Sequence, residues 1–209
     1  MSSRDAILGN IRQQLKQRLS QREPAPHPGI EPPLPRLGED LMTTLLSRMD
    51  AVQMSYERLD SEQTISDAVI RFIRSRGDDP TTQSVDVSPQ LSALDWQGLP
   101  HVQFGPARAG SLYGVTTCFA AIAETGSIVM VSGADHAVTQ TFLPDCHLVV
   151  LRPRQVVARP EAVWPLVRAL PSVPRAVNFN TGPSRTGDIE QTIEIGAHGP
   201  RAMHVLIVE

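Results

Sequence analysis

Five short runs rich in branched apolar residues constrain the fold of this chain more than any other feature. They lie near residues 101–104, 127–132, 147–151, 175–179 and 204–208. In runs such as HLVVL and HVLIV the apolar residues do not alternate with polar ones, which is typical of strands buried on both faces. Helical stretches are predicted between some of them, around residues 135–143 and 161–170. The sequence therefore predicts an α/β fold with a mainly parallel sheet flanked by helices.

The N-terminal part of the chain predicts a helical arm. Residues 3–19 place Ile7, Leu8, Ile11 and Leu15 at helical spacing, and residues 1–22 carry five basic side chains against one acidic side chain. Residues 24–35 contain six prolines, which favour an extended linker. We divide the chain into an arm at 1–22, a linker at 23–38 and a folded domain at 39–209. A solvated amphipathic arm is favoured over a helix that docks on a partner.

Two further helices are predicted before the first strand. One spans about 39–59, and the second, within 61–77, places Ile65, Val69 and Ile73 on one face. Ser61 and Gly77 are its expected cap residues.

Composition excludes several classes of function. Only one of the 19 basic residues is a lysine, and neither GxGxxG nor GxSxG occurs. These facts argue against a P-loop, a Schiff-base enzyme, a Rossmann dinucleotide site and an α/β-hydrolase. A net charge of −3 gives no reason to expect nucleic acid as a partner. We see no membrane span and no secretory signal, and we expect a cytoplasmic protein.

The stretch AAIAETGSIVMVSG, residues 120–133, contains the first candidate site. One interpretation is a tight turn in which Gly126 adopts a positive φ, with Thr125 and Ser127 beside it. The other interpretation starts from Glu124, a carboxylate between two apolar runs, which could act as a nucleophile or base.

The stretch NTGPSRTGDIE, residues 180–190, contains the second candidate site. It follows a predicted strand, and open α/β sheets bind ligands at the carboxyl ends of their strands. Backbone amides around Gly182, the hydroxyls of Ser184 and Thr186 and the guanidinium of Arg185 could hold an anion. The alternative is a capped short helix with a solvated Arg185.

Four residues near the end of the chain superficially resemble a set of metal ligands: Asp188, Glu190, His198 and His204. Their spacing matches no metal-site signature, so we predict no metal. Asp188, Glu190 and His198 are instead expected to orient the preceding anion loop.

Together, AIAETGS, HLVVL, TGPSRTGDIE and GAHGP resemble the LUD domain of the lactate utilisation protein C (LutC, YkgG) family, over about residues 40–209. The resemblance implies a fold like that of the NagB/RpiA/CoA-transferase group. It also implies a role in oxidising L-lactate to pyruvate together with iron–sulfur subunits. Cys118 and Cys146 are too few for an iron–sulfur cluster, so the clusters are expected in the partner subunits and no cofactor in this chain.

The leading prediction is therefore a subunit of an L-lactate utilisation system that binds a small anionic metabolite. The binding residues would come from the 125–127 turn and the 182–186 loop. One alternative is a stand-alone enzyme with Glu124 as nucleophile or base, by analogy with CoA-transferases. The other is a regulatory module that senses a metabolite.

Overall fold

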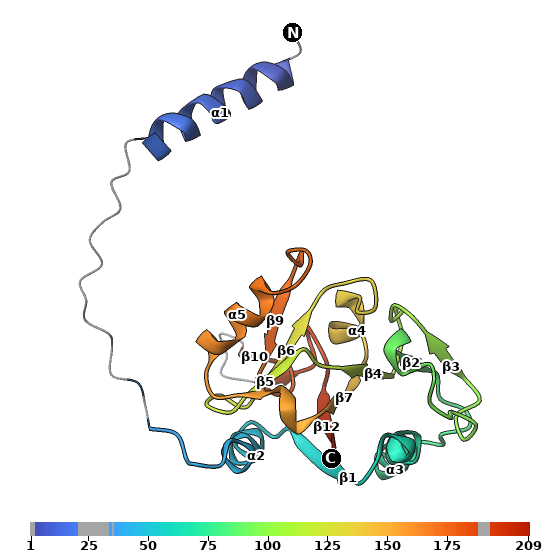
Figure 1. Ribbon diagram of the computed structural model, residues 1–209. Coiled ribbons are helices and arrows are strands. Elements are labelled where there is room, and N and C mark those ends of the chain that lie inside the picture. The colour runs from blue at the N-terminus through green and yellow to red at the C-terminus, as the bar shows by residue number, and fades with distance from the viewer. Residues whose placement is uncertain (1–2, 21–33, 35, 188–192) are drawn as a thin grey trace. The chain divides into compact units, whose positions relative to one another are not determined.

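The computed structural model describes residues 3–20, 34, 36–187 and 193–209 of the chain (Figure 1). Asp188 and Glu190, which we expected to orient the anion loop, lie outside the described residues. The chain divides into two compact units, Met1–Arg36 and Leu37–Glu209. The first contains helix α1 (Ser3–Ser20), in which Ile7, Ile11 and Leu15 are exposed.

The second unit is a mixed α/β domain. Its α-helices are α2 (Leu41–Ala51), α3 (Ile65–Ser75), α4 (Val138–Phe142) and α5 (Val163–Arg168). Its strands are β1 (Ser55–Leu59), β2 (Val85–Val87), β3 (Val102–Phe104), β4 (Tyr113–Thr117), β5 (Ala120–Ile122), β6 (Ser127–Val131), β7 (Cys146–Leu151), β8 (Val156–Val157), β9 (Val177–Asn180), β10 (Arg185–Gly187), β11 (Ile193–Ile195) and β12 (Ala202–Val208). Among the described residues, no helix is both long and apolar enough to cross a bilayer.

Six strands form one parallel sheet in the order β1-β12-β7-β4-β2-β3. Strand β7 is central and buried along its whole length, which explains why CHLVVL contains no polar alternation. The predicted α/β class with a mainly parallel sheet is confirmed.

Helices cover both faces of this sheet. Side chains of α3 such as Ile65 and Val69 pack with Val85, Tyr113 and Leu148 in one apolar cluster. Leu45 and Met49 of α2 belong to a second cluster, with residues such as Val149 and Val205 of the sheet. Figure 1 shows α2 and α3 on opposite sides of β1.

A smaller sheet packs on the α2 side, with the order β8-β5-β6-β9. Strand β6 pairs antiparallel with both β5 and β9. Ile128 and Met130 of β6 join the α2 cluster, whereas Val129 faces Val163 of α5. The predicted strands at 127–132 and 175–179 therefore exist, but they do not belong to the parallel sheet. Buried on both faces by different layers, β6 shows the same apolar run as a parallel strand.

The predicted helix at 39–59 was wrong in its second half. Asp40 caps α2, because its carboxylate accepts hydrogen bonds from the amides of Met42 and Thr43. The helix ends at Ala51, and Gln53 adopts a φ of 61°. The chain then turns into β1, which pairs with β12 at the sheet edge. A left-handed residue that is not glycine ends this helix, so the sequence carries no glycine to mark the stop.

Candidate functional site

The turn at residues 123–126 joins the antiparallel strands β5 and β6. The amide of Gly126 donates to the carbonyl of Ile122 at 2.9 Å, and Gly126 has a φ of 69°. The observed turn agrees with the tight-turn interpretation of AETG, in which Gly126 has a positive φ. The carboxylate of Glu124 is partly buried and lies 3.7 Å from the guanidinium of Arg159. Paired in this way, Glu124 lines neither of the cavities described below.

Three hydroxyls connect this turn to the start of the second predicted site. The Thr125 and Ser127 oxygens are 2.6 Å apart, and the Ser127 and Thr181 oxygens are also 2.6 Å apart. The two candidate stretches, separated by more than fifty residues in the sequence, are therefore neighbours. Strand pairing between β6 and β9 brings them together.

Both stretches also rest on the end of α2. A Cβ added to Gly126 would lie 2.8 Å from the Cβ of Arg48, and a Cβ added to Gly182 would lie 2.7 Å from the carbonyl oxygen of Val52. Arg185 reaches the same helix end, where its guanidinium donates to the Val52 carbonyl at 3.2 Å and to Oε1 of Gln53 at 2.7 Å. Gly126, Gly182 and Arg185 therefore contribute to packing against the end of α2, in addition to any role in binding a ligand.

The local structure around Ser184 differs from the prediction in two ways. Strand β9, which precedes it, is antiparallel to β6, so the rule for the carboxyl ends of parallel sheets does not apply to it. Residues 185–187 form β10, which pairs with β11, where we considered a helix N-terminus. An anion here would depend on side chains more than on a helix dipole.

Ser184 nevertheless joins the two motifs of the family resemblance. Its amide donates to the carbonyl of Pro200 at 2.9 Å, and its carbonyl accepts from the amide of Gly196 at 3.0 Å. A cavity of about 290 Å³, which we name the loop cavity, lies between the motifs. Its lining residues are Phe142, Phe179, Asn180, Thr181, Gly182, Pro183, Ser184, Arg185, His198, Gly199, Pro200 and Met203. Ser184, Arg185 and His198 are brought together there, whereas Thr125, Gly126, Ser127 and Thr186 do not line it.

A larger cavity, about 490 Å³, lies at the carboxyl ends of β2 and β4, and we name it the edge cavity. From β2 the chain continues to β3 on one side, and from β4 it continues by way of the small sheet to β7 on the other. Open α/β sheets bind ligands at such a reversal of strand order. Gln90 follows β2 and Thr117 ends β4, and the Thr117 hydroxyl donates to the Gln90 carboxamide oxygen.

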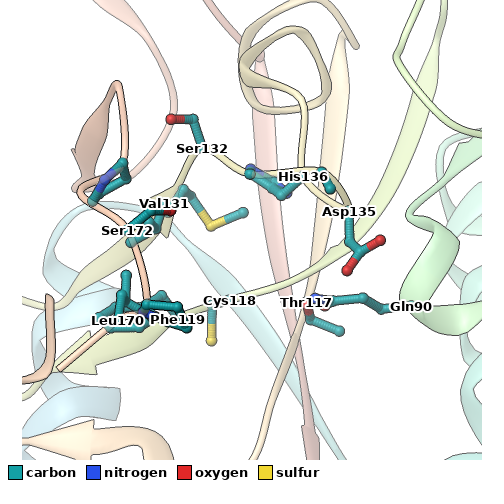
Figure 2. Close-up of a pocket in the computed structure, with 15 residues that line it drawn as sticks. Gln90, Thr117, Cys118, Phe119, Val131, Ser132, Asp135, His136, Leu170 and Ser172 are labelled. Carbon is teal, nitrogen blue, oxygen red and sulfur yellow. Dashed lines mark hydrogen bonds between the residues drawn. The ribbon is translucent and has the colours of Figure 1, made fainter.

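The remaining walls of the edge cavity come from three other segments. They are Cys118 and Phe119 after β4, residues 130–136 at the end of β6, and Leu170, Pro171, Ser172 and Pro174 after α5. In Figure 2, Gln90, Thr117 and Asp135 lie on one side and Phe119, Leu170 and Ser172 on the other. The hydroxyl of Ser88 donates to the carbonyl of Asp135 at 2.9 Å and so ties this segment to the end of β2.

Buried polar side chains lie beneath α4, next to the edge cavity. Nε2 of His136 is 3.0 Å from the Thr141 hydroxyl, and Nε2 of His147 is 2.8 Å from the Thr116 hydroxyl. Burial lowers the pKa of His147 to about 3, and it also lowers the pKa of His136 below its usual value. His136 therefore offers the cavity a neutral imidazole at pH 7. Among the described residues, Nδ1 of His136 has no hydrogen-bond partner.

The edge cavity was not predicted from the sequence. The sequence feature that could have indicated it is the polar run SGADH, residues 132–136. This run follows the buried strand 127–131 directly, and polar residues at the end of a buried strand are typical of a binding site. His147 is fully buried within β7 and behaves as a core histidine. Cys118 and Cys146 are free and buried. No group of three or more His, Cys, Asp or Glu suited to a metal occurs in the part of the chain that the structure describes.

Comparison with known proteins finds a family model that matches the C-terminal half of the chain. Residues 107–208 match the model of the LUD domain, and they contain the whole loop cavity. The matched segment comprises 102 of the 209 residues and is similar to the LUD domain. The resemblance drawn from AIAETGS, TGPSRTGDIE and GAHGP is thereby confirmed.

Relatives of similar sequence include Lactate utilization protein C of Anoxybacillus flavithermus, which is 32% identical over 97 residues. That match covers 46% of this chain and 44% of the relative, so the chain spans less than half the length of this relative. The uncharacterized protein YkgG of Escherichia coli is 26% identical over 100% of this chain and 99% of its own length. A crystal structure of a DUF162 family protein from Deinococcus radiodurans shares the fold, with a TM-score of 0.58 and 23% identity over 81% of this chain and 96% of the other.

Proposed function

We propose that this LUD-domain protein takes part in the utilisation of L-lactate and binds a small carboxylate in the loop cavity. The observation that carries the proposal is the position of this cavity. All its lining residues lie inside the segment that matches the LUD domain, and relatives with a similar sequence are named Lactate utilization protein C. A volume of about 290 Å³ admits a three-carbon acid with water.

The side chains of the loop cavity have the chemistry for such a ligand. Arg185 provides a guanidinium, whose paired donors suit a carboxylate. The Ser184 hydroxyl and the His198 imidazole supply further donors. To bind a ligand with both of its outer nitrogens, Arg185 would exchange its contact with Gln53 for one with the carboxylate.

Iron–sulfur subunits complete the proposal. Oxidation of lactate to pyruvate releases two electrons, which need a carrier. The two cysteines of this chain cannot supply the four thiolates of a typical cluster, so the clusters would belong to partner proteins. In this arrangement the LUD-domain chain positions the carboxylate and the partners take up the electrons.

Binding is tested by calorimetry with L-lactate and pyruvate. We expect Arg185→Ala to weaken the affinity by roughly 1.5–3 kcal/mol, the value of a hydrogen bond to a charged group. Gln53→Ala is the matched control, because it removes the 2.7 Å contact of Arg185 but keeps the guanidinium, which still donates to the Val52 carbonyl. Equal affinity of the wild type and Arg185→Ala for both acids would contradict the assignment.

Partnership is tested by recovering the tagged full chain from cells grown on L-lactate, with cells grown without it as the control. Near-stoichiometric recovery of cysteine-rich iron–sulfur proteins is the expected result. Recovery of the chain alone would contradict the shared electron path.

Glu124 separates the two alternative functions from this proposal. A stand-alone enzyme would lose turnover on Glu124→Gln with its fold intact, whereas a sensing module would keep the turnover of its partners. The ion pair with Arg159 at 3.7 Å favours neither, and catalysis by Glu124 stays a prediction.

A further inference from the structure

The two cavities differ in charge. Among the described residues that line the edge cavity there is one carboxylate, Asp135, and no lysine or arginine. His136 adds an imidazole that burial keeps neutral. The loop cavity, by contrast, contains Arg185. A small anion would be repelled by Asp135, so the edge cavity suits a group that is uncharged and offers hydroxyl donors.

The edge cavity also has two unlike walls. Asp135, Gln90 and Thr117 present a carboxylate, a carboxamide and a hydroxyl on one side, and Phe119 and Leu170 present apolar surface on the other (Figure 2). Its volume of about 490 Å³ is in the range of pockets for small molecules. A molecule with a flat ring for the apolar wall and a separate group with adjacent hydroxyls for the polar wall matches both sides.

A buried polar atom without a partner lies next to the edge cavity. His136 is 9% exposed and lines the cavity, and its Nδ1 has no hydrogen-bond partner among the described residues. Its other nitrogen is fixed by Thr141 at 3.0 Å, so the ring is held in one orientation. Buried polar atoms are almost always paired in folded proteins, so the unpaired Nδ1 adds polar character beside the cavity.

We propose that the edge cavity binds a ribonucleoside group. The carboxylate of Asp135 would accept hydrogen bonds from the two adjacent ribose hydroxyls. The base would lie against Phe119 and Leu170, and its polar edge would meet Gln90. Ala134 and Asp135 are exposed, so phosphates attached to the ribose would extend into solvent. A free nucleoside and the nucleoside end of a larger phosphorylated cofactor share this chemistry.

The two proposals stand on different cavities and fail separately. Loss of lactate binding in Arg185→Ala concerns the loop cavity, and nucleoside binding concerns the edge cavity. Arg185→Ala should therefore leave nucleoside affinity unchanged.

The test is calorimetry of the full chain with the four common ribonucleosides, their 2′-deoxy forms and their 5′-diphosphates. We expect at least one ribonucleoside to bind, and its 2′-deoxy form to bind about tenfold more weakly or worse, because one hydrogen bond to a carboxylate is lost. A diphosphate that binds as well as the nucleoside would identify the end of a cofactor. A diphosphate that binds more weakly would identify a free nucleoside. No binding by any ribonucleoside or diphosphate at millimolar concentration overturns the proposal.

Asp135→Ala is the decisive variant, and it should weaken the bound ribonucleoside about tenfold or more. Asp60→Ala, at an exposed aspartate that does not line the cavity, is the matched control and should bind as the wild type does. Asp135→Ala should also lose the preference for ribose over deoxyribose. Unchanged affinity and preference in Asp135→Ala would show that the ribose does not lie against this carboxylate.

Discussion

Gly126 and Gly182 set how closely the two candidate turns approach the end of α2. Both have positive φ, 69° and 90°, and both face backbone or Cβ atoms of α2 and the residue after it at less than 3 Å from an added Cβ. Any other residue would be strained by the positive φ, and its Cβ would clash with the end of α2 or with the residue after it. The hydroxyl chain from Thr125 to Thr181 lies beside these two glycines.

Gly182→Ala should therefore lower the free energy of unfolding by about 1–3 kcal/mol, the range for a strained backbone residue. Urea denaturation of the full chain measures it. Gly133→Ala is the control, because an added Cβ there meets nothing within 4 Å and the φ of Gly133 is not positive. A loss of stability in Gly133→Ala as large as that in Gly182→Ala would contradict the explanation by positive φ and close contact.

The end of α2 links the fold to the loop cavity at the level of whole elements. Met54 donates its amide to the carbonyl of Met49 at 2.9 Å, which closes the helix around the left-handed Gln53. The side chain of Gln53 then accepts from Arg185, so one residue ends the helix and holds the cation of the loop cavity. This double use gives a reason for a residue other than glycine at a left-handed position.

Replacements at Gln53 separate these two contributions. Gln53→Gly and Gln53→Ala both lose the contact with Arg185, but only glycine relieves the φ of 61°. We expect Gln53→Gly to be more stable than Gln53→Ala by about 1 kcal/mol in urea denaturation. If the two variants are equally stable, the backbone of Gln53 carries no strain.

For the whole molecule, the sequence was sufficient for the α/β class and for the positions of the most apolar strands. Strand β7 was predictable because every residue in it is buried, and the turn at Gly126 because AETG lies between two apolar runs. The antiparallel pairing of β6 was not, since burial on both faces gives the same apolar run in either kind of sheet. The edge cavity was not predictable either, because Gln90, Thr117, Asp135 and Leu170 come from separate segments that only the sheet order brings together.

Buried histidines make the stability of the whole domain depend on pH. Burial lowers the pKa of His147 to about 3 and that of His204 to about 4, from an ordinary value of 6.5. Below pH 6.5 these histidines are protonated in the unfolded chain but stay neutral in the folded domain. The free energy of unfolding therefore decreases as the pH is lowered. Their full contribution is present above pH 6.5 and is lost progressively as the pH falls to about 4 and below.

Removing one of these histidines should flatten that dependence. Between pH 6 and 4.5, His147→Gln should reduce the slope of unfolding free energy against pH by up to one proton, about 1.4 kcal/mol per pH unit. Urea denaturation across this range measures the slope, and His204→Asn provides a second variant in which the same change is expected. His101→Gln is the control, because it removes a histidine that is exposed. Slopes in both buried variants equal to that of the wild type would mean that these rings take up protons in the folded domain as readily as in the unfolded chain.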